Sequence, residues 1–247
     1  MKNFINNLFY IVIAYNLITV GGITGKEAFY SIDEDKKRLN KNNAIKTILA
    51  IFLSISILAM SMITPIVLNG YEMYKEAINK KSLDDTIEEI RGQSNFISLN
   101  NISDEFLNLV LKSEDHRFYK HSGFDFIAIA RAMYNNIKAG KIVQGGSTIT
   151  QQLAKNSYFS FDKKYERKVA EVFVAKDLER KLTKDEILEL YCNVIYFGEG
   201  CYGIKDAAKY YYGIEADKLT LEQAKALVKT LKNPNNYNPK KMKLVQS

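Results

Sequence analysis

The sequence predicts a mainly α-helical domain that follows an N-terminal membrane-spanning helix. Residues 47–68 contain no charged side chain, and a helix of that length crosses a hydrocarbon core of about 30 Å. Several later segments repeat apolar residues at intervals of three and four, behind residues that cap helices. No segment of comparable length alternates apolar and polar residues, so strands form at most a minor part of the fold.

The composition is that of an ordinary globular protein with additional segments. The 247 residues are 47% hydrophobic and 26% charged, which excludes disordered and collagen-like chains and leaves room for one domain of moderate size. A net charge of +7 would suit nucleic acid in a cytosolic protein, but beside a membrane helix it better matches lipid head groups and phosphates. We therefore expect no nucleic-acid partner. Cys192 and Cys201 are too few for a disulfide scaffold and lack the spacing of a zinc site.

The orientation in the membrane follows from the charges around the apolar run. A second uncharged stretch, Asn3–Gly25, contains Asn6, Asn7 and Asn16 in its interior, which make its insertion marginal, so one-pass and two-pass topologies both remain open. The positive-inside tendency places the linker between the two stretches in the cytoplasm and everything after Leu68 outside the cell. The basic residues of this linker are Lys26, Lys36, Lys37, Arg38, Lys41 and Lys46.

The chain divides into four predicted parts. Residues 1–43 hold the first hydrophobic stretch and the basic cytoplasmic linker, and residues 44–68 form the transmembrane helix. A buried core helix or a cleaved signal sequence fits 44–68 less well, because the run is too long for a signal core and lacks a small-residue cleavage site. Residues 69–101 are polar with scattered apolar positions, as expected of a juxtamembrane stalk. Residues 102–247 form the folded domain.

Helix starts and ends are predicted at several places in this domain. Ser103 can cap a helix that leads to Glu114, and a helical pattern over residues 125–139 ends at Gly140, a natural left-handed cap position. Further helices are predicted to start at capping residues, namely Ser147 or Thr148, Asp162, Thr183 and Thr220.

The first group of chemically capable residues is the segment 114–125 (EDHRFYKHSGFD), at the junction of two helical patterns. Functional side chains are often presented at such junctions. A carboxylate among aromatic neighbours can have its pKa raised by desolvation toward the value useful for a general base. A solvated turn of charge pairs is also consistent with these residues, so the segment alone does not indicate catalysis.

The second group is the segment 144–156 (QGGSTITQQLAKN). Free backbone N–H groups at the start of a helix attract phosphate, and Lys155 adds a point charge. The segment lacks the lysine placement of a Walker loop, so it does not indicate a nucleotide. By itself a glycine pair before a helix can also be only a turn.

A third group lies on the helix expected after Asp162. Four residues share one face through spacings of three and four, namely Lys164, Arg167, Lys168 and Glu171. Arg167 and Glu171 could form a simple surface ion pair. Alternatively the basic face binds a pyrophosphate, with Glu171 orienting the cations or holding a metal. Residue types do not separate these interpretations.

Together with EILELYCNVIYFGEGCYGI and NPNNYNP further along, these segments resemble the family 51 peptidoglycan glycosyltransferases. This family comprises the monofunctional biosynthetic transglycosylases and the matching domain of class A penicillin-binding proteins. The resemblance covers Glu114 to Pro239. It implies a lysozyme-like α-helical transglycosylase domain on the outer face of the cell membrane. The implied reaction adds lipid II to a growing glycan strand, with β-1,4 linkage and release of undecaprenyl pyrophosphate, for cell wall synthesis.

The resemblance also implies roles for individual residues. Glu114 matches the catalytic glutamate that deprotonates the 4-hydroxyl of the acceptor sugar, and Glu171 matches the second glutamate. The positions that line the donor side and contact its pyrophosphate are matched by Gly146, Ser147, Gln152, Lys155, Arg167 and Lys168, with Lys163 as another cation. The rest of the first motif, which shapes the pocket, is matched by Asp115, Arg117, Phe118, His121 and Gly123.

The resemblance and the basic residues also bear on the cofactor, the partners and the alternative functions. A pyrophosphate leaving group stabilised by cations needs no strong general acid, whereas a sugar alkoxide does, so the basic face favours synthesis over cleavage. Mg²⁺ or Mn²⁺ is a compatible cofactor, and no organic cofactor is expected. Lipid II, the growing strand and the membrane are the implied partners, and contacts with other cell wall synthesis and division proteins are compatible with them. A lysozyme-like peptidoglycan hydrolase and an inactive membrane-anchored scaffold remain as alternatives.

Three features of the sequence depart from the family pattern. Cys192 stands where leucine is usual, and residues 229–232 replace a small, glycine-containing turn before NPNNYNP. Relatives are expected to continue beyond Ser247 through further helices, and the scaffold alternative rests on this shorter C-terminal part.

Overall fold

The computed structural model describes residues 25–159 and 165–241. The chain divides into two units, residues 1–64 and 65–247. Helix α2 (Gly25–Lys80) supplies all the described residues of the first unit and begins the second. The predicted hydrophobic stretch Asn3–Gly25 lies, apart from its last residue, outside the described residues.

The predicted membrane helix is part of α2. Its segment Ile45–Lys80 is long and apolar enough to cross a membrane, with a mean hydropathy of 2.3 over its most apolar window, in which no residue is buried by protein. Hydroxyl groups within this segment donate hydrogen bonds to backbone carbonyls three or four residues earlier, as Ser54 does to Ala50 and Thr64 to Met60. Polar groups satisfied inside the helix are what a lipid environment requires. The sequence prediction of a helix that could span a membrane is confirmed.

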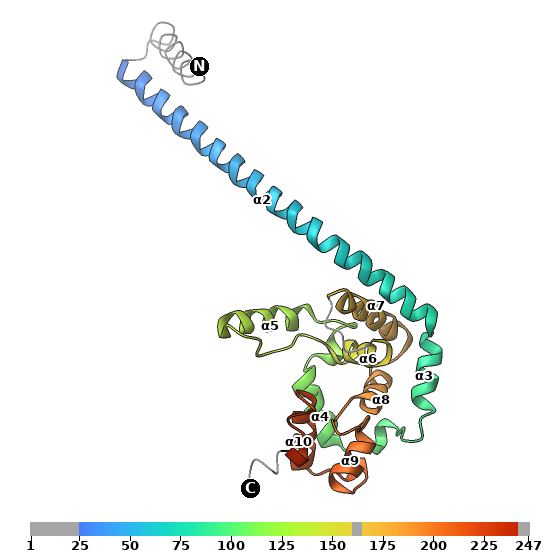
Figure 1. Cartoon of the computed structure of the whole chain (residues 1–247). Coiled ribbons are helices and arrows are strands. Elements are labelled where there is room, and N and C mark those ends of the chain that lie inside the picture. The colour runs from blue at the N-terminus through green and yellow to red at the C-terminus, as the bar shows by residue number, and fades with distance from the viewer. Residues whose placement is uncertain (1–24, 160–164, 242–247) are drawn as a thin grey trace. The chain divides into compact units, whose positions relative to one another are not determined.

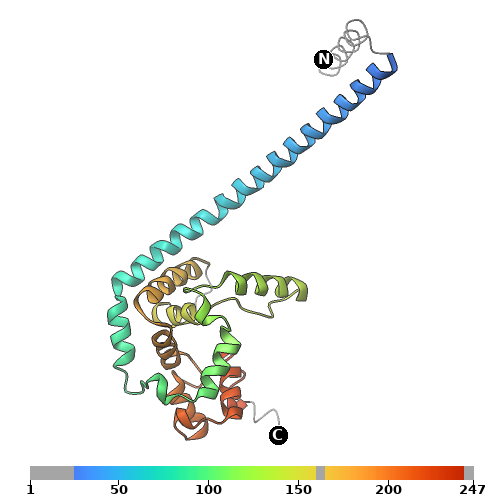
Figure 2. The same cartoon turned by 180° about the vertical axis from the view of Figure 1, so that it is seen from behind.

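The second unit is a set of helices joined by short loops and 3₁₀ turns (Figures 1 and 2). Within the described residues there is no strand, and only an isolated bridge joins Tyr196 to Tyr202. The mainly α-helical fold class is therefore confirmed. The α-helices are α3 (Leu83–Arg91), α4 (Asp104–Glu114), α5 (Phe126–Ala139), α6 (Ile149–Tyr158), α7 (Tyr165–Lys181), α8 (Lys184–Val194), α9 (Ile204–Tyr212) and α10 (Leu221–Leu231), and the 3₁₀ turns are η1 (Leu99–Asn101), η2 (Phe118–Lys120) and η3 (Ala216–Lys218).

Most of the predicted helix starts carry the expected caps. Ser103 accepts a hydrogen bond from the Phe106 N–H at the start of α4. Of the two predicted alternatives for the cap of α6, Ser147 and Thr148, the cap is Thr148. Capping boxes begin four helices, at Ser82, Thr148, Thr183 and Thr220. Gly140 ends α5 with a φ of 63°, as predicted. The expected cap at Asp162 lies outside the described residues.

The core is built around α8. Ile187, Leu190 and Tyr191 of this helix are completely buried. Helix α6 packs against both α7 and α8, and α4 packs against α10 (Figure 1). This arrangement brings the end of α4 and the start of α6 to one side of the core, where the first two motifs of the sequence meet.

Residues 82–101, predicted as part of a stalk, share this core. Ile87 and Ile90 of α3 are buried and α3 packs against α8. Arg91 at the end of α3 pairs with Glu186, with 3.0 Å between Arg91 Nη2 and Glu186 Oε1. The burial of Ile87 and Ile90, together with the Arg91–Glu186 ion pair, makes α3 a structural part of the helical domain.

The C-terminal part of α2 packs on α7. A Cβ atom added at Gly70 would lie 2.5 Å from the Cβ atom of Val169, so only glycine permits this approach. Tyr71 lies edge-on to Phe173, and Tyr74 donates a 2.5 Å hydrogen bond from its hydroxyl to Asp177 Oδ2. Because α7 contacts α2 on one face and α6 on another, its apolar residues are not confined to a single stripe.

Candidate active site

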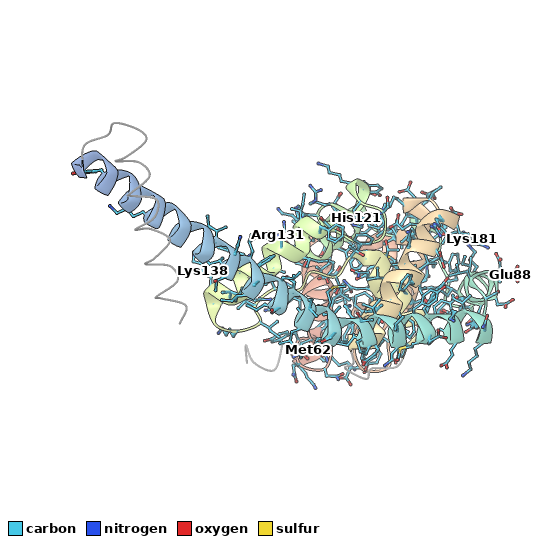
Figure 3. The ribbon with its side chains drawn as sticks, turned by 90° about the horizontal axis from the view of Figure 1, so that it is seen from above. Met62, Glu88, His121, Arg131, Lys138 and Lys181 are labelled. Carbon is cyan, nitrogen blue, oxygen red and sulfur yellow. The ribbon has the colours of Figure 1, made fainter. Side chains whose placement is uncertain are left out.

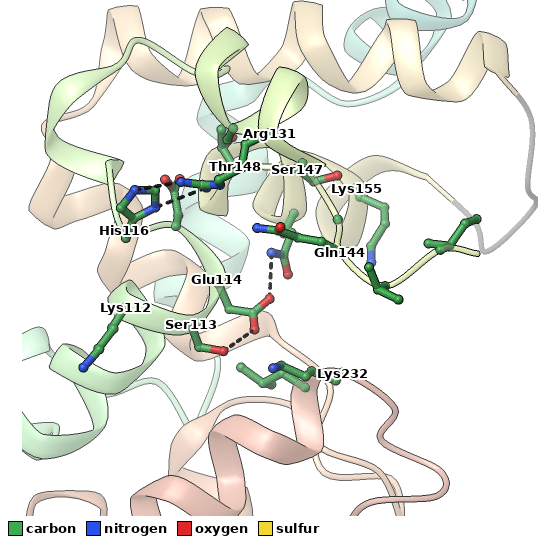
Figure 4. Close-up of a pocket in the computed structure, with 18 of the residues that line it drawn as sticks. Lys112, Ser113, Glu114, His116, Arg131, Gln144, Ser147, Thr148, Lys155 and Lys232 are labelled. Atoms are coloured by element: carbon green, nitrogen blue, oxygen red, sulfur yellow. Dashed lines mark hydrogen bonds between the residues drawn. The ribbon is translucent and has the colours of Figure 1, made fainter. Parts of the chain in front are cut away.

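A cavity of about 750 Å³ lies where α4, the segment before α6 and the end of α10 meet (Figure 4). Both motifs at the α4 and α6 ends contribute to its wall. Seven of the residues predicted from the sequence line it, namely Glu114, Asp115, Gly146, Ser147, Gln152, Lys155 and Lys168. The structure therefore brings the predicted base and two of the predicted cations to one cavity.

Glu114 is the last residue of α4 and its half-buried carboxylate faces the cavity (Figure 4). Its Oε2 accepts a hydrogen bond of 3.3 Å from Gln152 Nε2, and its Oε1 accepts one of 3.2 Å from the Ser113 hydroxyl. Each carboxylate oxygen thus accepts a hydrogen bond from a neighbouring side chain and retains lone pairs that can receive a proton from a bound molecule. This is the arrangement that a general base requires.

Asp115 joins the first motif to the second. Its buried Oδ2 accepts a hydrogen bond of 3.0 Å from the Ile149 N–H and lies 2.8 Å from His121 Nε2. The Thr148 hydroxyl donates a further hydrogen bond of 2.7 Å to the carbonyl of Gly123. The end of α4 is thereby tied to the start of α6.

The other predicted residues of the first motif lie behind the cavity wall. Phe118 is buried in the core, and Arg117 Nε lies 2.8 Å from Asp125 Oδ2. Burial acts to raise the pKa of Asp125, but the N–H groups at the start of α5 and the Arg117 guanidinium outweigh it and hold that pKa below its usual value. Gly123 has a φ of 92°, which favours glycine. Their predicted role in shaping the pocket stays a prediction.

The cationic side of the cavity comes from α6 and α7. Burial is the largest influence on Lys155 and lowers its pKa; Glu171 opposes this effect, while Lys168 and Arg167 add to it. Lys168 Nζ lies 2.5 Å from Glu171 Oε2, and Arg167 Nε lies 3.0 Å from Glu171 Oε1, an ion-pair contact without hydrogen-bond geometry. Arg167 and Glu171 therefore stand behind Lys168. Lys163 lies outside the described residues.

Several residues of the site were not singled out from the sequence. Arg131 of α5 lies at the cavity with its Nη1 atom 3.0 Å from His116 Nε2. Lys232, from the segment that departs from the family pattern, also lines the cavity. Tyr191 of α8 is completely buried, and its hydroxyl donates a 3.3 Å hydrogen bond to Gln152 Oε1. The sequence signal for Tyr191 was a polar phenol among the apolar residues on the buried face of α8, where its hydroxyl needs a hydrogen-bond partner.

The donor set of the site does not resemble a protein-held metal centre. No group of three or more His, Cys, Asp or Glu side chains with suitable geometry occurs among the residues of known placement. The carboxylate of Glu171 is already engaged by two cations. The cavity offers a carboxylate and lysine ammonium groups.

Comparison with known proteins gives matches over this region. The model of the transglycosylase family matches residues 81–246. The chain is 45% identical over 143 residues to penicillin-binding protein 1F of Bacillus subtilis and 44% identical over 144 residues to penicillin-binding protein 1A of Aquifex aeolicus, covering 58% of this chain and 20% of each relative. It is 43% identical over 155 residues to a Cupriavidus necator protein assigned by name to the transglycosylases, covering 63% of this chain and 67% of that protein. The chain spans about a fifth of the length of the two penicillin-binding proteins.

Proposed function

The chain belongs to the transglycosylase family, and from that premise we propose that it is a peptidoglycan glycosyltransferase. It polymerises lipid II into β-1,4-linked glycan strands and releases undecaprenyl pyrophosphate. The observation that carries the proposal is the single cavity lined by Glu114, Lys155 and Lys168. A base and a group of cations in one cavity are what transfer of a sugar from a pyrophosphate requires.

The reaction follows from these residues. Glu114 takes the proton of the acceptor 4-hydroxyl as that oxygen attacks C1 of the donor sugar. The bond between C1 and the phosphate oxygen breaks, and its electron pair leaves with the pyrophosphate. Lys155 and Lys168 neutralise the developing charge, while the buried Glu171 holds Lys168 and Arg167 in place. Attack from the face opposite the α-linked pyrophosphate inverts C1 and gives the β-linkage.

The two alternatives are less well supported. A hydrolase of similar fold must protonate a sugar alkoxide and needs a carboxylic acid beside the leaving group. Apart from Glu114 and Asp115, the described ionisable side chains that line the cavity are histidine, lysine and arginine. Release of soluble muropeptides from preformed cell wall would favour the hydrolase. An unchanged cellular phenotype in a Glu114→Gln strain would favour the inactive scaffold.

The membrane is the proposed setting of this reaction. Helix α5, which carries Arg131 and Lys138 (Figure 3), exposes large apolar side chains, and the segment after it exposes Ile142 at 89%. Large exposed apolar patches on soluble proteins usually mark contact surfaces. We assign α5 and residues 142–143 to contact with the bilayer, so that the lipid tail of the substrate stays in the membrane. The apolar residues of α5 concerned are Phe126, Ile127, Met133, Tyr134 and Ile137.

The topology is also a proposal. Helix α2 crosses the cell membrane, the basic linker that includes Lys36, Lys37 and Arg38 lies in the cytoplasm, and the helical domain lies outside the cell. Whether the chain crosses once or twice is left open by the first hydrophobic stretch. Contacts with other cell wall synthesis and division proteins stay a prediction.

A divalent cation fits this site only as a companion of the substrate. The side chains described by the structure offer no resident site, because Glu171 is engaged by Arg167 and Lys168. Mg²⁺ or Mn²⁺ would instead be held by the pyrophosphate oxygens, which are the hard ligands these ions prefer. We propose no organic cofactor.

Polymerisation of labelled lipid II by the detergent-purified full chain tests the proposed function. The wild type should form polymer and Glu114→Gln should form none, with both proteins folded by circular dichroism. Glu222→Gln makes the same chemical change at an exposed position of α10 and should retain full activity. A folded wild type that forms no polymer would overturn the proposal.

A further inference from the structure

A second interaction reaches the candidate base from the protein core. Tyr191 of α8 is completely buried, and its hydroxyl lies 3.3 Å from Gln152 Oε1. Gln152 Nε2 lies 3.3 Å from Glu114 Oε2. Resting on the proposed function, we propose that Tyr191 is a positioning residue that orients the Gln152 amide and, through it, the Glu114 carboxylate.

The phenol keeps its proton. Burial raises the pKa of Tyr191 well above its ordinary value, and the negative charge of Glu114 adds to this effect. A buried hydroxyl needs a hydrogen-bond partner, because leaving it without one costs free energy. The partner of the Tyr191 hydroxyl is the amide oxygen of Gln152.

The phenol thereby sets the direction of the amide. A glutamine side chain presents an acceptor at one end and donors at the other. With its oxygen toward Tyr191, the NH₂ group of Gln152 faces Glu114. A reversed amide would place its oxygen against the carboxylate, with no hydrogen between two acceptors. The proton of Tyr191 thus selects the orientation in which Gln152 donates to the base.

The supporting elements are rigid. Tyr191 is on α8 and Gln152 is on α6, and these two helices pack against each other in the core. The Ser113 hydroxyl also donates a hydrogen bond to Glu114, but Ser113 is exposed. The Gln152 contact links the base to the buried core.

A double-mutant cycle on the full chain tests the relay. We expect Tyr191→Phe to lower kcat about tenfold, the effect of about one lost hydrogen bond on a reaction barrier, and to leave KM for lipid II unchanged. Because Tyr191 acts through Gln152, Tyr191→Phe should cause no further loss of kcat in a Gln152→Ala background. Independent losses that multiply would overturn the proposal.

Tyr211→Phe is the matched control. The Tyr211 hydroxyl also donates a hydrogen bond within the protein, of 2.9 Å to the carbonyl of Phe197, and it does not line the cavity. Tyr211→Phe should lower the thermal stability while kcat stays at the wild-type value. If Tyr211→Phe lost as much kcat as Tyr191→Phe, the effect of Tyr191→Phe would be a general loss of structure, and Tyr191 would have only a structural role.

A measurement independent of activity separates this inference from the proposed function. In chains labelled with ¹⁵N at glutamine, the side-chain NH₂ signals of Gln152 should shift strongly when Glu114 becomes Gln. The same change should have little effect in a Tyr191→Phe background, where the amide is free to turn. Equal shifts in both backgrounds would overturn the relay even in a chain that forms no polymer. An inactive wild type with the expected shifts would overturn the proposed function alone.

Discussion

Lys168 Nζ lies 2.5 Å from Glu171 Oε2, and the Glu171 side chain has no exposed surface. The second oxygen of Glu171 is paired with Arg167 Nε at 3.0 Å. Two cations one residue apart on α7 are therefore held by a single buried carboxylate. Without it, their mutual repulsion would move them apart, and Lys168 would lose its place in the cavity.

Glu171→Gln should therefore weaken both stability and activity. Removing one member of a buried ion pair costs about 3–5 kcal/mol, and we expect the low end because the Lys168 side chain is 46% exposed. Polymer formation should fall at least about tenfold. Chemical denaturation and the lipid II assay measure the two effects. Glu166→Gln on the same helix is the control, and equal stability of the two variants would contradict the prediction.

The lowered pKa of Lys155 predicts a shift in the alkaline limit of activity. Lys155 loses its proton at a lower pH than an ordinary lysine, so its positive charge disappears earlier as the pH rises. The pH dependence of kcat/KM reports groups of the free enzyme. The arginine of Lys155→Arg keeps its charge at all working pH values. The fall of kcat/KM at alkaline pH, the alkaline limb of the profile, should therefore move to higher pH in this variant. Lys225→Arg on α10 should leave the limb in place, and an unmoved limb in Lys155→Arg would refute the assignment.

Gly198 and Gly200 provide a matched pair for stability. Both have positive φ values, 86° and 78°, where a side chain costs about 1–2 kcal/mol. A Cβ atom at Gly198 would also overlap a backbone atom, at 2.4 Å from the Pro234 carbonyl oxygen, whereas one at Gly200 would meet nothing within 4 Å. Gly198→Ala should thus lose at least about 3 kcal/mol and Gly200→Ala much less. Urea denaturation compares them, and similar losses would contradict the structure.

The proposed contact of α5 with lipid can be tested by fluorescence. The sequence contains no tryptophan, so an introduced one is the sole reporter. In vesicles with brominated lipid tails, Ile137→Trp on α5 should be quenched, because bromine quenches only at close range. Leu221→Trp, at an exposed position of α10, should remain bright. Equal emission from both variants would place α5 outside the bilayer.

The sequence predicted the features that depend on local order. Ser103, Thr183 and Thr220 were identified as caps because capping chemistry involves residues three positions apart. Glu114 and Lys155 could be assigned to one site only through the family resemblance, since they lie on different helices. Tyr191 was missed because spacing along α8 shows that its side chain is buried and not that an amide from α6 meets it. The short helix α3 was missed because its two buried isoleucines stand among charged residues.

The shared contact of Asp115 has a consequence for folding. One buried oxygen accepts a hydrogen bond from the Ile149 amide and lies against His121, so the ends of α4 and α6 cannot separate without stranding a buried charge. We therefore expect Glu114 and the start of α6 to fold and unfold together in one cooperative step. The Ile149 amide proton should then exchange with solvent only when both helix ends separate, and a state with one end folded and the other unfolded should not be populated.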